Sequence, residues 1–215
     1  MIKIAPSILS ADLLDIENEV KMVDQSGAEY IHIDIMDGHY VPNITFGPNI
    51  VRALKKVTKK TLDVHLMITP VLSYIEEFIE SGANIISFHP EADKNPDKII
   101  EIISNSNCIP GIALHPNITV KSIEHLISKV QIIVVMTVIP GFGGQKFLES
   151  QITKINELNS FRKNNNLKFE IEVDGGINNM TAKKCIKNGA NVLVAGSYIF
   201  SQKKSKYKKL INSLK

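Results

Sequence analysis

Residues 26–31 read Ser-Gly-Ala-Glu-Tyr-Ile, and the same form returns as Ser-Gly-Ala-Asn-Ile-Ile at 81–86 and as Asn-Gly-Ala-Asn-Val-Leu at 188–193. In each copy, Gly-Ala follows an amphipathic stretch and precedes a short apolar run. Glycine at this place lets a helix end in the left-handed conformation before the chain enters a strand. Gly27 and Gly82 are 55 residues apart, and Gly82 and Gly189 are 107 apart. One strand-and-helix unit therefore takes about 27 residues.

The chain contains eight short runs of apolar and β-branched residues. Most are apolar nearly throughout, as expected of parallel strands that are buried on both faces. Eight strand-and-helix units predict an α/β fold, a single-domain (β/α)8 TIM barrel over residues 1–215 with eight parallel strands. An open doubly wound sheet is the alternative, but no Gly-x-Gly-x-x-Gly follows the first run. The runs are Ile2–Leu9, Tyr30–Met36, Thr61–Ile68, Asn84–Phe88, Ile109–Leu114, Gln131–Val138, Lys168–Val173 and Asn191–Ala195.

Helices are expected between the runs. Ser10 and Asp12 precede apolar residues spaced three and four apart, which marks the first helix. Proline is tolerated in the first turn of a helix because its missing N–H would have no partner there. We therefore place Pro48, Pro70 and Pro96 near the first turns of the next helices. The remaining helices are expected at 119–128, 148–163, 179–188 and 203–214.

The composition excludes several classes of protein. With 215 residues, of which 44% are hydrophobic, the chain can bury a sizeable core. A net charge of +3 does not indicate a nucleic-acid partner, and no apolar stretch approaches the length of a membrane span. Two cysteines form neither a disulfide framework nor a cysteine-based metal site. We expect a cytoplasmic homo-oligomer whose partner is a small molecule, with no nucleic acid and no membrane.

Polar residues gather where the strands end, which is the face where barrel enzymes carry their active sites. His32 and Asp34 are two residues apart on the second strand, so both point toward the barrel axis. His65 has the same parity on the third strand, and Asp174 ends the seventh. Two imidazoles and two carboxylates on one axis predict a site for one divalent metal ion, which could be zinc, iron(II), manganese or cobalt.

Other ionisable residues near strand ends are harder to assign. Glu170 and Glu172 share the parity of Asp174, and three acids cannot all be buried without partners. We therefore expect the two glutamates to lie toward the bottom of the barrel or the start of the strand. His89 and His115 each end a strand and precede a proline, and a site role and a loop-entry role are equally open for them.

Glycine-rich loops follow the last three strands. Glycines let backbone N–H groups converge on an anion, and the loops after strands seven and eight commonly bind phosphate in barrels, aided by a helix N-terminus. No Walker-type Gly-Lys-Ser/Thr is present, so a nucleoside triphosphate is not expected. The expected phosphate-binding residues are Gly141, Phe142, Gly143, Gly144, Gly175, Gly176, Gly196 and Ser197.

A metal ion and a phosphate clamp leave room for a small sugar phosphate between them. We place Asp34 and Asp174 on opposite sides of the barrel mouth, where one could remove a proton from one face of a substrate and the other return it on the opposite face. The intermediate would be an enediolate, whose negative oxygens a metal ion can stabilise. Met36, Met67 and Met136 could line this site and exclude water, although core packing also explains them.

Six motifs resemble those of the ribulose-phosphate 3-epimerase family, and together they span nearly the whole chain. They are Ala5-Pro6-Ser7-Ile8-Leu9-Ser10-Ala11-Asp12, His32-Ile33-Asp34-Ile35-Met36-Asp37-Gly38, Val41-Pro42-Asn43, Asp63-Val64-His65-Leu66-Met67, Pro140-Gly141-Phe142-Gly143-Gly144-Gln145 and Glu172-Val173-Asp174-Gly175-Gly176-Ile177. The resemblance implies interconversion of D-ribulose 5-phosphate and D-xylulose 5-phosphate in the pentose phosphate pathway. It also implies a divalent metal bound by His32, Asp34, His65 and Asp174.

The resemblance further assigns roles within this site. It implies that Asp34 and Asp174 are the two acid/base groups and that Ser7, His65 and Asp174 contact the substrate. The glycine loops and Ser197 would hold the substrate, chiefly at its phosphate.

The chain also departs from the family pattern. Ile139 stands where the family usually has asparagine, Thr137 often is serine, and Tyr198 often is a small residue. The loss of a polar side chain at 139 is expected to affect fine substrate positioning, whereas the expected metal and acid/base residues are all present.

Two alternative functions are considered. A D-allulose 6-phosphate 3-epimerase would use the same chemistry, although Gly175-Gly176 and Ser10-Ala11-Asp12 look more like the pentose enzyme. A metal-free phosphate-binding barrel, acting as a lyase or isomerase or only binding a metabolite, is the second alternative.

Overall fold

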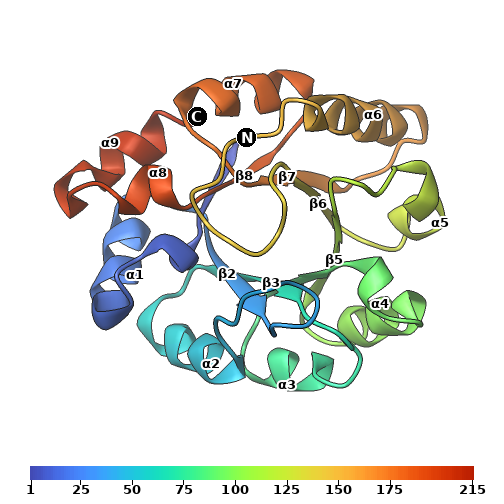
Figure 1. The fold of residues 1–215 in the computed structure, drawn as a ribbon, viewed down its shortest axis with the longest axis horizontal. Coiled ribbons are helices and arrows are strands. Elements are labelled where there is room, and N and C mark those ends of the chain that lie inside the picture. The colour runs from blue at the N-terminus through green and yellow to red at the C-terminus, as the bar shows by residue number, and fades with distance from the viewer.

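The computed structural model describes residues 1–215 and shows a ring of eight parallel strands with helices around it (Figure 1). Each strand from β2 to β8 pairs with the next, and β8 pairs with β1. A single parallel bridge between Ser7 and His32 joins β1 to β2, so the barrel is nearly closed. The predicted (β/α)8 barrel is confirmed. The strands are β1 (Lys3–Pro6), β2 (Tyr30–Met36), β3 (Thr61–Met67), β4 (Ile85–Phe88), β5 (Ile109–Leu114), β6 (Ile132–Met136), β7 (Glu170–Asp174) and β8 (Val192–Ala195).

The helices lie outside the strands, and several are shorter than expected. The stretches 119–128 and 203–214 each begin as a 3-10 turn, and only α5 and α9 within them are α-helical. The short helix α8, directly after β8, was not anticipated from the sequence. The helices are α1 (Ile16–Gln25), α2 (Pro48–Val57), α3 (Ile75–Glu80), α4 (Pro96–Ser104), α5 (Glu124–Ile127), α6 (Gln151–Asn164), α7 (Asn179–Asn188), α8 (Ser197–Phe200) and α9 (Tyr207–Asn212).

Proline placement was predicted correctly for two of three helices. Pro48 and Pro96 are the first residues of α2 and α4. The placement of Pro70 was wrong, because α3 begins only at Ile75. The intervening loop is held from the next βα loop instead, where Asp93 accepts a hydrogen bond from the backbone N–H of Leu72 at 2.9 Å.

Strand parity divides the buried residues into two groups. The residues that alternate outward, such as Ile31, Ile33 and Ile35, belong to a cluster of 50 buried residues between strands and helices. The residues that point inward form a smaller apolar cluster of ten residues, which includes Val134 and Val194. The ionisable residues of the interior come from β2, β3 and β7, and Ser87 on β4 adds a buried hydroxyl. This polar part of the axis leads up to the barrel mouth.

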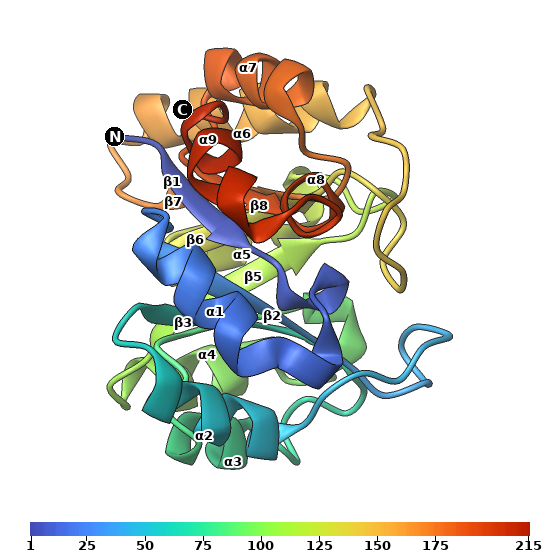
Figure 2. The same cartoon turned by 90° about the vertical axis from the view of Figure 1, so that its left-hand side faces the viewer.

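The mouth of the barrel is covered by two long loops. The β2–α2 loop and the β6–α6 loop extend from the same end of the barrel (Figure 2), and the second crosses the centre of the ring when viewed down the axis (Figure 1). The side chain of Asn43 in the first loop donates a hydrogen bond to the carbonyl of Gly141 in the second at 2.8 Å. The two loops are therefore tied together above the strand ends. None of the helices has the length and apolar character that a membrane crossing requires.

The repeated glycines have the backbone conformation that the sequence predicts. Gly27, Gly82 and Gly189 have φ angles of +94°, +101° and +114°. Their surroundings differ, because a Cβ on Gly27 would meet nothing within 4 Å, whereas one on Gly189 would lie 2.3 Å from Cγ of Asn159.

These two glycines provide a matched test of the fold. Gly27→Ala is expected to lower the free energy of unfolding by about 1–2 kcal/mol, the cost of a left-handed backbone for an L-residue. Gly189→Ala adds overpacking against α6 and should lose about 1–3 kcal/mol more. Urea unfolding of both variants measures the difference, and equal losses would contradict the packing argument.

Candidate active site

Four side chains converge at the mouth of the barrel. His32 and Asp34 come from β2, His65 from β3 and Asp174 from the end of β7, and none is more than 9% exposed. Nε2 of His32 lies 3.5 Å from Oδ1 of Asp34 and 3.8 Å from Oδ2 of Asp174. Nδ1 of His65 lies 3.8 Å and 3.6 Å from the same two oxygens. Each nitrogen thus faces both carboxylates, which lie closer together than an arrangement on opposite sides of the mouth suggests.

The donor set and the spacing of these atoms fit one metal ion. The four candidate ligand atoms all lie within 4.8 Å of one another. Four ligands about 2.1 Å from a tetrahedral ion are about 3.4 Å apart, which is close to the observed separations. Nε2 of His32 and Nδ1 of His65 are buried and have no hydrogen-bond partner. Two unpartnered nitrogens aimed at two carboxylates are what a bound cation would satisfy.

In each of the two imidazole rings, the nitrogen that faces away from the carboxylates of Asp34 and Asp174 contacts another buried side chain. Nδ1 of His32 lies 2.7 Å from Oδ2 of Asp63, and Nε2 of His65 lies 3.1 Å from Nε2 of His89. His89 is fully buried, and burial lowers its pKa to about 4. A neutral His89 can accept a hydrogen bond from His65. His89 stands at the entry to the loop after β4, where it precedes a 3-10 turn, and its ring also contacts His65. His115 lies in a loop too, and its Nδ1 accepts a hydrogen bond from the N–H of Asn117.

Opposite charges determine the electrostatics of the cluster. Burial lowers the pKa of His32, but the carboxylates of Asp63 and Asp34 outweigh it and hold that pKa well above its usual range. Burial raises the pKa of Asp34, and the interaction with His32 reverses this effect, so that the pKa falls below its usual value. Without a cation, a protonated His32 would stabilise the carboxylates. A bound metal ion would replace that proton.

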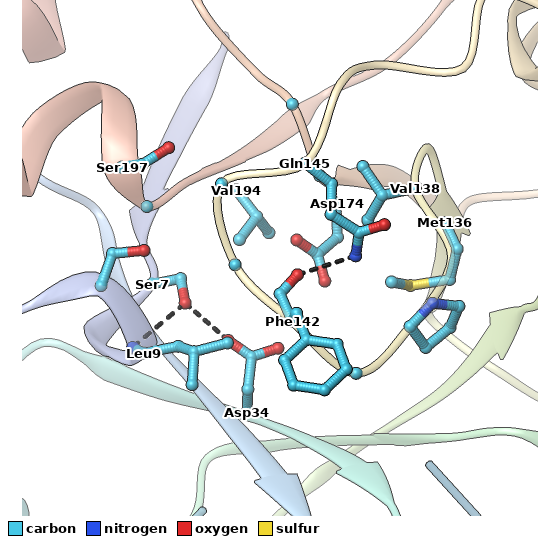
Figure 3. A pocket seen from close by; sticks show the side chains of 18 of the residues that line it. Ser7, Leu9, Asp34, Met136, Val138, Phe142, Gln145, Asp174, Val194 and Ser197 are labelled. Carbon is cyan, nitrogen blue, oxygen red and sulfur yellow. Dashed lines mark hydrogen bonds between the residues drawn. The ribbon is translucent and has the colours of Figure 1, made fainter. Parts of the chain in front are cut away.

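Asp34 and Asp174 of this cluster form part of the wall of a pocket at the barrel mouth. Figure 3 shows Asp34 and Asp174 on its walls, with Ser7 donating a hydrogen bond to Oδ2 of Asp34 at 2.5 Å. His32 and His65 do not line it, although His65 was predicted to contact the substrate. The sequence-predicted residues that line it are Ser7, Asp34, Met36, Met67, Met136, Gly141, Phe142, Gly143, Gly144, Asp174, Gly175, Gly176, Gly196 and Ser197.

The upper part of the pocket consists of backbone rather than charged side chains. No lysine or arginine lines it. Gly176 approaches the neighbouring loop so closely that a Cβ on it would lie 2.6 Å from the backbone nitrogen of Phe147. Ser10, which was not among the predicted site residues, also lines the pocket, and its hydroxyl would lie 2.7 Å from a Cβ on Gly196. Any anion held here would therefore rely on N–H and hydroxyl donors.

Ile139 lies outside this pocket. It is 49% exposed and lines a neighbouring groove with Tyr40, Val41 and Pro42. Its backbone carbonyl accepts a hydrogen bond from the side chain of Gln145, which also binds the carbonyl of Phe142. The departure at 139 thus changes the outer surface of the loop.

The interior below the mouth holds acids that parity alone did not assign. Glu170 lies at the start of β7, as expected. There it forms an ion pair with Lys3 at 2.6 Å. Glu172 instead is fully buried in mid-strand, with Oε1 3.4 Å from Nδ1 of His32. Burial, together with the charge of Asp63, raises its pKa well above the usual range. A protonated Glu172 carries no charge, so it can be buried on the same strand as Asp174 without an opposite charge beside it.

This combination defines a class: a (β/α)8 barrel with a buried His/Asp cluster able to hold a metal ion, beneath a pocket lined by glycine loops. The family model for the "Ribulose-phosphate 3 epimerase family" matches residues 3–200. The chain belongs to the ribulose-phosphate 3-epimerase family, and the prediction that it is an enzyme of this family is confirmed.

Two bacterial relatives match this chain over nearly their whole length. A ribulose-phosphate 3-epimerase of Bacillus subtilis is 47% identical over 216 residues, covering 100% of this chain and 99% of the relative. One from Escherichia coli is 36% identical, covering 99% and 94%. Among solved structures, a mutant tryptophan synthase α-subunit from Pyrococcus furiosus superposes with a TM-score of 0.72 at 14% identity, covering 100% of this chain and 99% of that one. At that identity the likeness shows the fold alone.

The protonated Glu172 leads to a pH-dependent prediction. The folded chain keeps this proton, whereas the unfolded chain releases it above the ordinary pKa of 4.5, so the buried acid costs stability as the pH rises. In metal-stripped protein, Glu172→Gln should therefore raise the free energy of unfolding more at pH 8 than at pH 5, by up to about 1.4 kcal/mol per pH unit. Urea unfolding across this range measures the effect, and a difference independent of pH would contradict a neutral Glu172.

Proposed function

We propose that this enzyme interconverts D-ribulose 5-phosphate and D-xylulose 5-phosphate by removing and returning the proton at C3 through an enediolate. One observation carries the proposal. Asp34 and Asp174 both face the pocket, beside two imidazole nitrogens that have no other partner. Membership of the epimerase family supports the same conclusion.

The phosphate group would occupy the glycine-lined end of the pocket. Backbone N–H groups of Gly175, Gly176 and Gly196 are the candidate donors, together with the hydroxyl of Ser197 at the start of α8. Since no cationic side chain lines the pocket, these uncharged donors would orient the phosphate and so direct the sugar carbons toward the carboxylates.

Asp34 and Asp174 would act as the two acid/base groups. The hydroxyl of Ser7 donates to Oδ2 of Asp34 and leaves Oδ1 facing the cluster, so it orients this carboxylate. Met36, Met67 and Met136 line the same pocket, and their apolar side chains would keep water away from the proton-transfer step.

The metal site would use Nε2 of His32, Nδ1 of His65 and one oxygen each of Asp34 and Asp174. A divalent ion there would supply Lewis-acid stabilisation of negative charge on the substrate oxygens. Zinc, iron(II), manganese and cobalt all suit this mixed set of ligands. The assignment of these residues, the cytoplasmic location and the homo-oligomeric state remain predictions.

The substrate and the two-base mechanism are tested together. The protein should epimerise D-ribulose 5-phosphate faster than D-allulose 6-phosphate and incorporate solvent deuterium at C3. Asp34→Asn and Asp174→Asn should each lower kcat by about 10²- to 10⁴-fold. Each variant should still exchange the C3 proton of one epimer only, with the two variants acting on different epimers.

Controls separate chemistry from metal loss in this experiment. Glu76→Gln, an exposed acid on α3, should leave kcat unchanged. The metal content of each aspartate variant is measured beside its rate. Near-full activity of Asp174→Asn, or an absence of deuterium at C3, would rule out the two-base enediolate mechanism.

Metal removal tests the cofactor and the metal-free alternative. Chelator-treated protein should lose epimerase activity, and one equivalent of zinc, iron(II), manganese or cobalt per chain should restore it. His65→Ala, which removes one candidate ligand, should weaken metal binding measured by competition with a chromogenic chelator. Full activity in protein shown to be metal-free would support the alternative of a metal-independent isomerase.

A further inference from the structure

We propose that Asp63 is a positioning residue that holds the ring of His32 from inside the barrel, so that Nε2 faces the site at the mouth. The inference rests on the proposed function, because it assigns a purpose to the orientation of one candidate ligand. It concerns a residue that does not line the pocket and would not touch the substrate.

The register of the barrel places the two side chains together. His32 on β2 and Asp63 on β3 are direct partners in the parallel pairing, and both point inward. Both are 0% exposed, and the contact between Nδ1 and Oδ2 is 2.7 Å long. A distance of this size is typical of a charge-assisted hydrogen bond.

The hydrogen bond between His32 and Asp63 determines which nitrogen of the His32 ring keeps a free lone pair. An ionised carboxylate can only accept, so Nδ1 of His32 carries the proton that is donated to Asp63. When the ring is neutral, Nε2 is then the unprotonated nitrogen. This atom has no partner and faces Asp34 and Asp174 at 3.5 Å and 3.8 Å. Histidines that bind metals usually have their second nitrogen held in this way.

His32 is the hydrogen-bonded partner that the structure gives the buried Asp63 carboxylate, and Glu172 lies beside them. The second oxygen of Asp63, Oδ1, has no hydrogen-bond partner, and neither do the oxygens of the neighbouring Glu172. Burial of a carboxylate with a single hydrogen-bond partner costs folding free energy. We therefore expect the bond to serve the partner, His32. His65, by contrast, is held by the neutral ring of His89 at 3.1 Å. The carboxylate would therefore make His32 the more strongly donating of the two imidazoles.

The test replaces the carboxylate by its amide. In Asp63→Asn, the side-chain NH₂ can donate to Nδ1, which favours the opposite tautomer with the proton on Nε2. Zinc affinity of the metal-stripped variant, measured by chelator competition, should fall about 10- to 100-fold. The matched control is Ser87→Ala, which removes a buried, unpartnered hydroxyl from β4 in the same interior and should keep the affinity of the parent.

A spectroscopic readout separates positioning from a loss of fold. In zinc-loaded protein labelled with ¹⁵N-histidine, His32 should show an Nδ1–H proton shifted far downfield by the bond to Asp63. The parent protein alone tests this, so the inference remains testable if Asp63→Asn does not fold. Folding of the variant is checked by its thermal unfolding.

The outcomes distinguish this inference from the proposed function. If Asp63→Asn folds and binds zinc as tightly as the parent, or if Nδ1 of His32 carries no proton in the zinc-loaded parent, Asp63 is not a positioning residue. If instead the parent neither binds a divalent ion nor epimerises pentose phosphates, the proposed function fails. In that case the metal-free parent is examined, where an Nδ1–H proton of His32 far downfield still reports the bond to Asp63.

Discussion

The structure depends on the burial of a charged set of side chains on the axis of a small barrel. Strand parity turns His32, Asp34, Asp63, His65, Glu172 and Asp174 inward, and all of them are at least nine-tenths buried. Such a set is stable only when each charge meets an opposite charge or a proton. The ring of His32 is central, because it contacts Asp63 below and Asp34 and Asp174 above.

The need to balance each buried charge explains why one half of the barrel interior is charged and the other half is apolar. The strands β2, β3 and β7 supply the ionisable groups, whereas the inward residues of β6 and β8, such as Val134 and Val194, are apolar. The apolar half packs densely and fixes the spacing between the strands. The polar half can therefore hold its donors and acceptors at defined distances, as a metal site and an acid/base pair require.

Much of this arrangement could be predicted from the sequence, because strand parity has a period of two and barrel sites lie at strand ends. His32, Asp34, His65 and Asp174 follow from these two rules. Asp63 shares the parity of His65 and could have been found in the same way. The rule that sites lie at strand ends does not identify it, because Asp63 lies two residues before His65 on β3, where its partner His32 on the adjacent strand decides its role.

Other features depended on tertiary contacts that no local pattern encodes. The contact of His89 with His65 arises between two strands, and a residue that precedes a proline gives no sign of it. Pro70 looked like a helix start, but the loop after it is held by Asp93 from a different βα unit. Ile139 seemed to affect the phosphate site from its sequence position, yet the side chain lies on the outer surface of its loop.

The charges of the site would also link metal binding to substrate binding. Asp34, Asp63 and Asp174 place three carboxyl groups around His32, and the pocket above offers a phosphate only uncharged donors. A sugar phosphate would bring further negative charge close to these carboxylates, and like charges in a poorly hydrated site repel strongly. A divalent cation between the two imidazoles and two carboxylates would offset that repulsion. The absence of lysine and arginine from the pocket wall therefore fits an enzyme in which the ion, rather than a side chain, provides the positive charge that substrate binding requires.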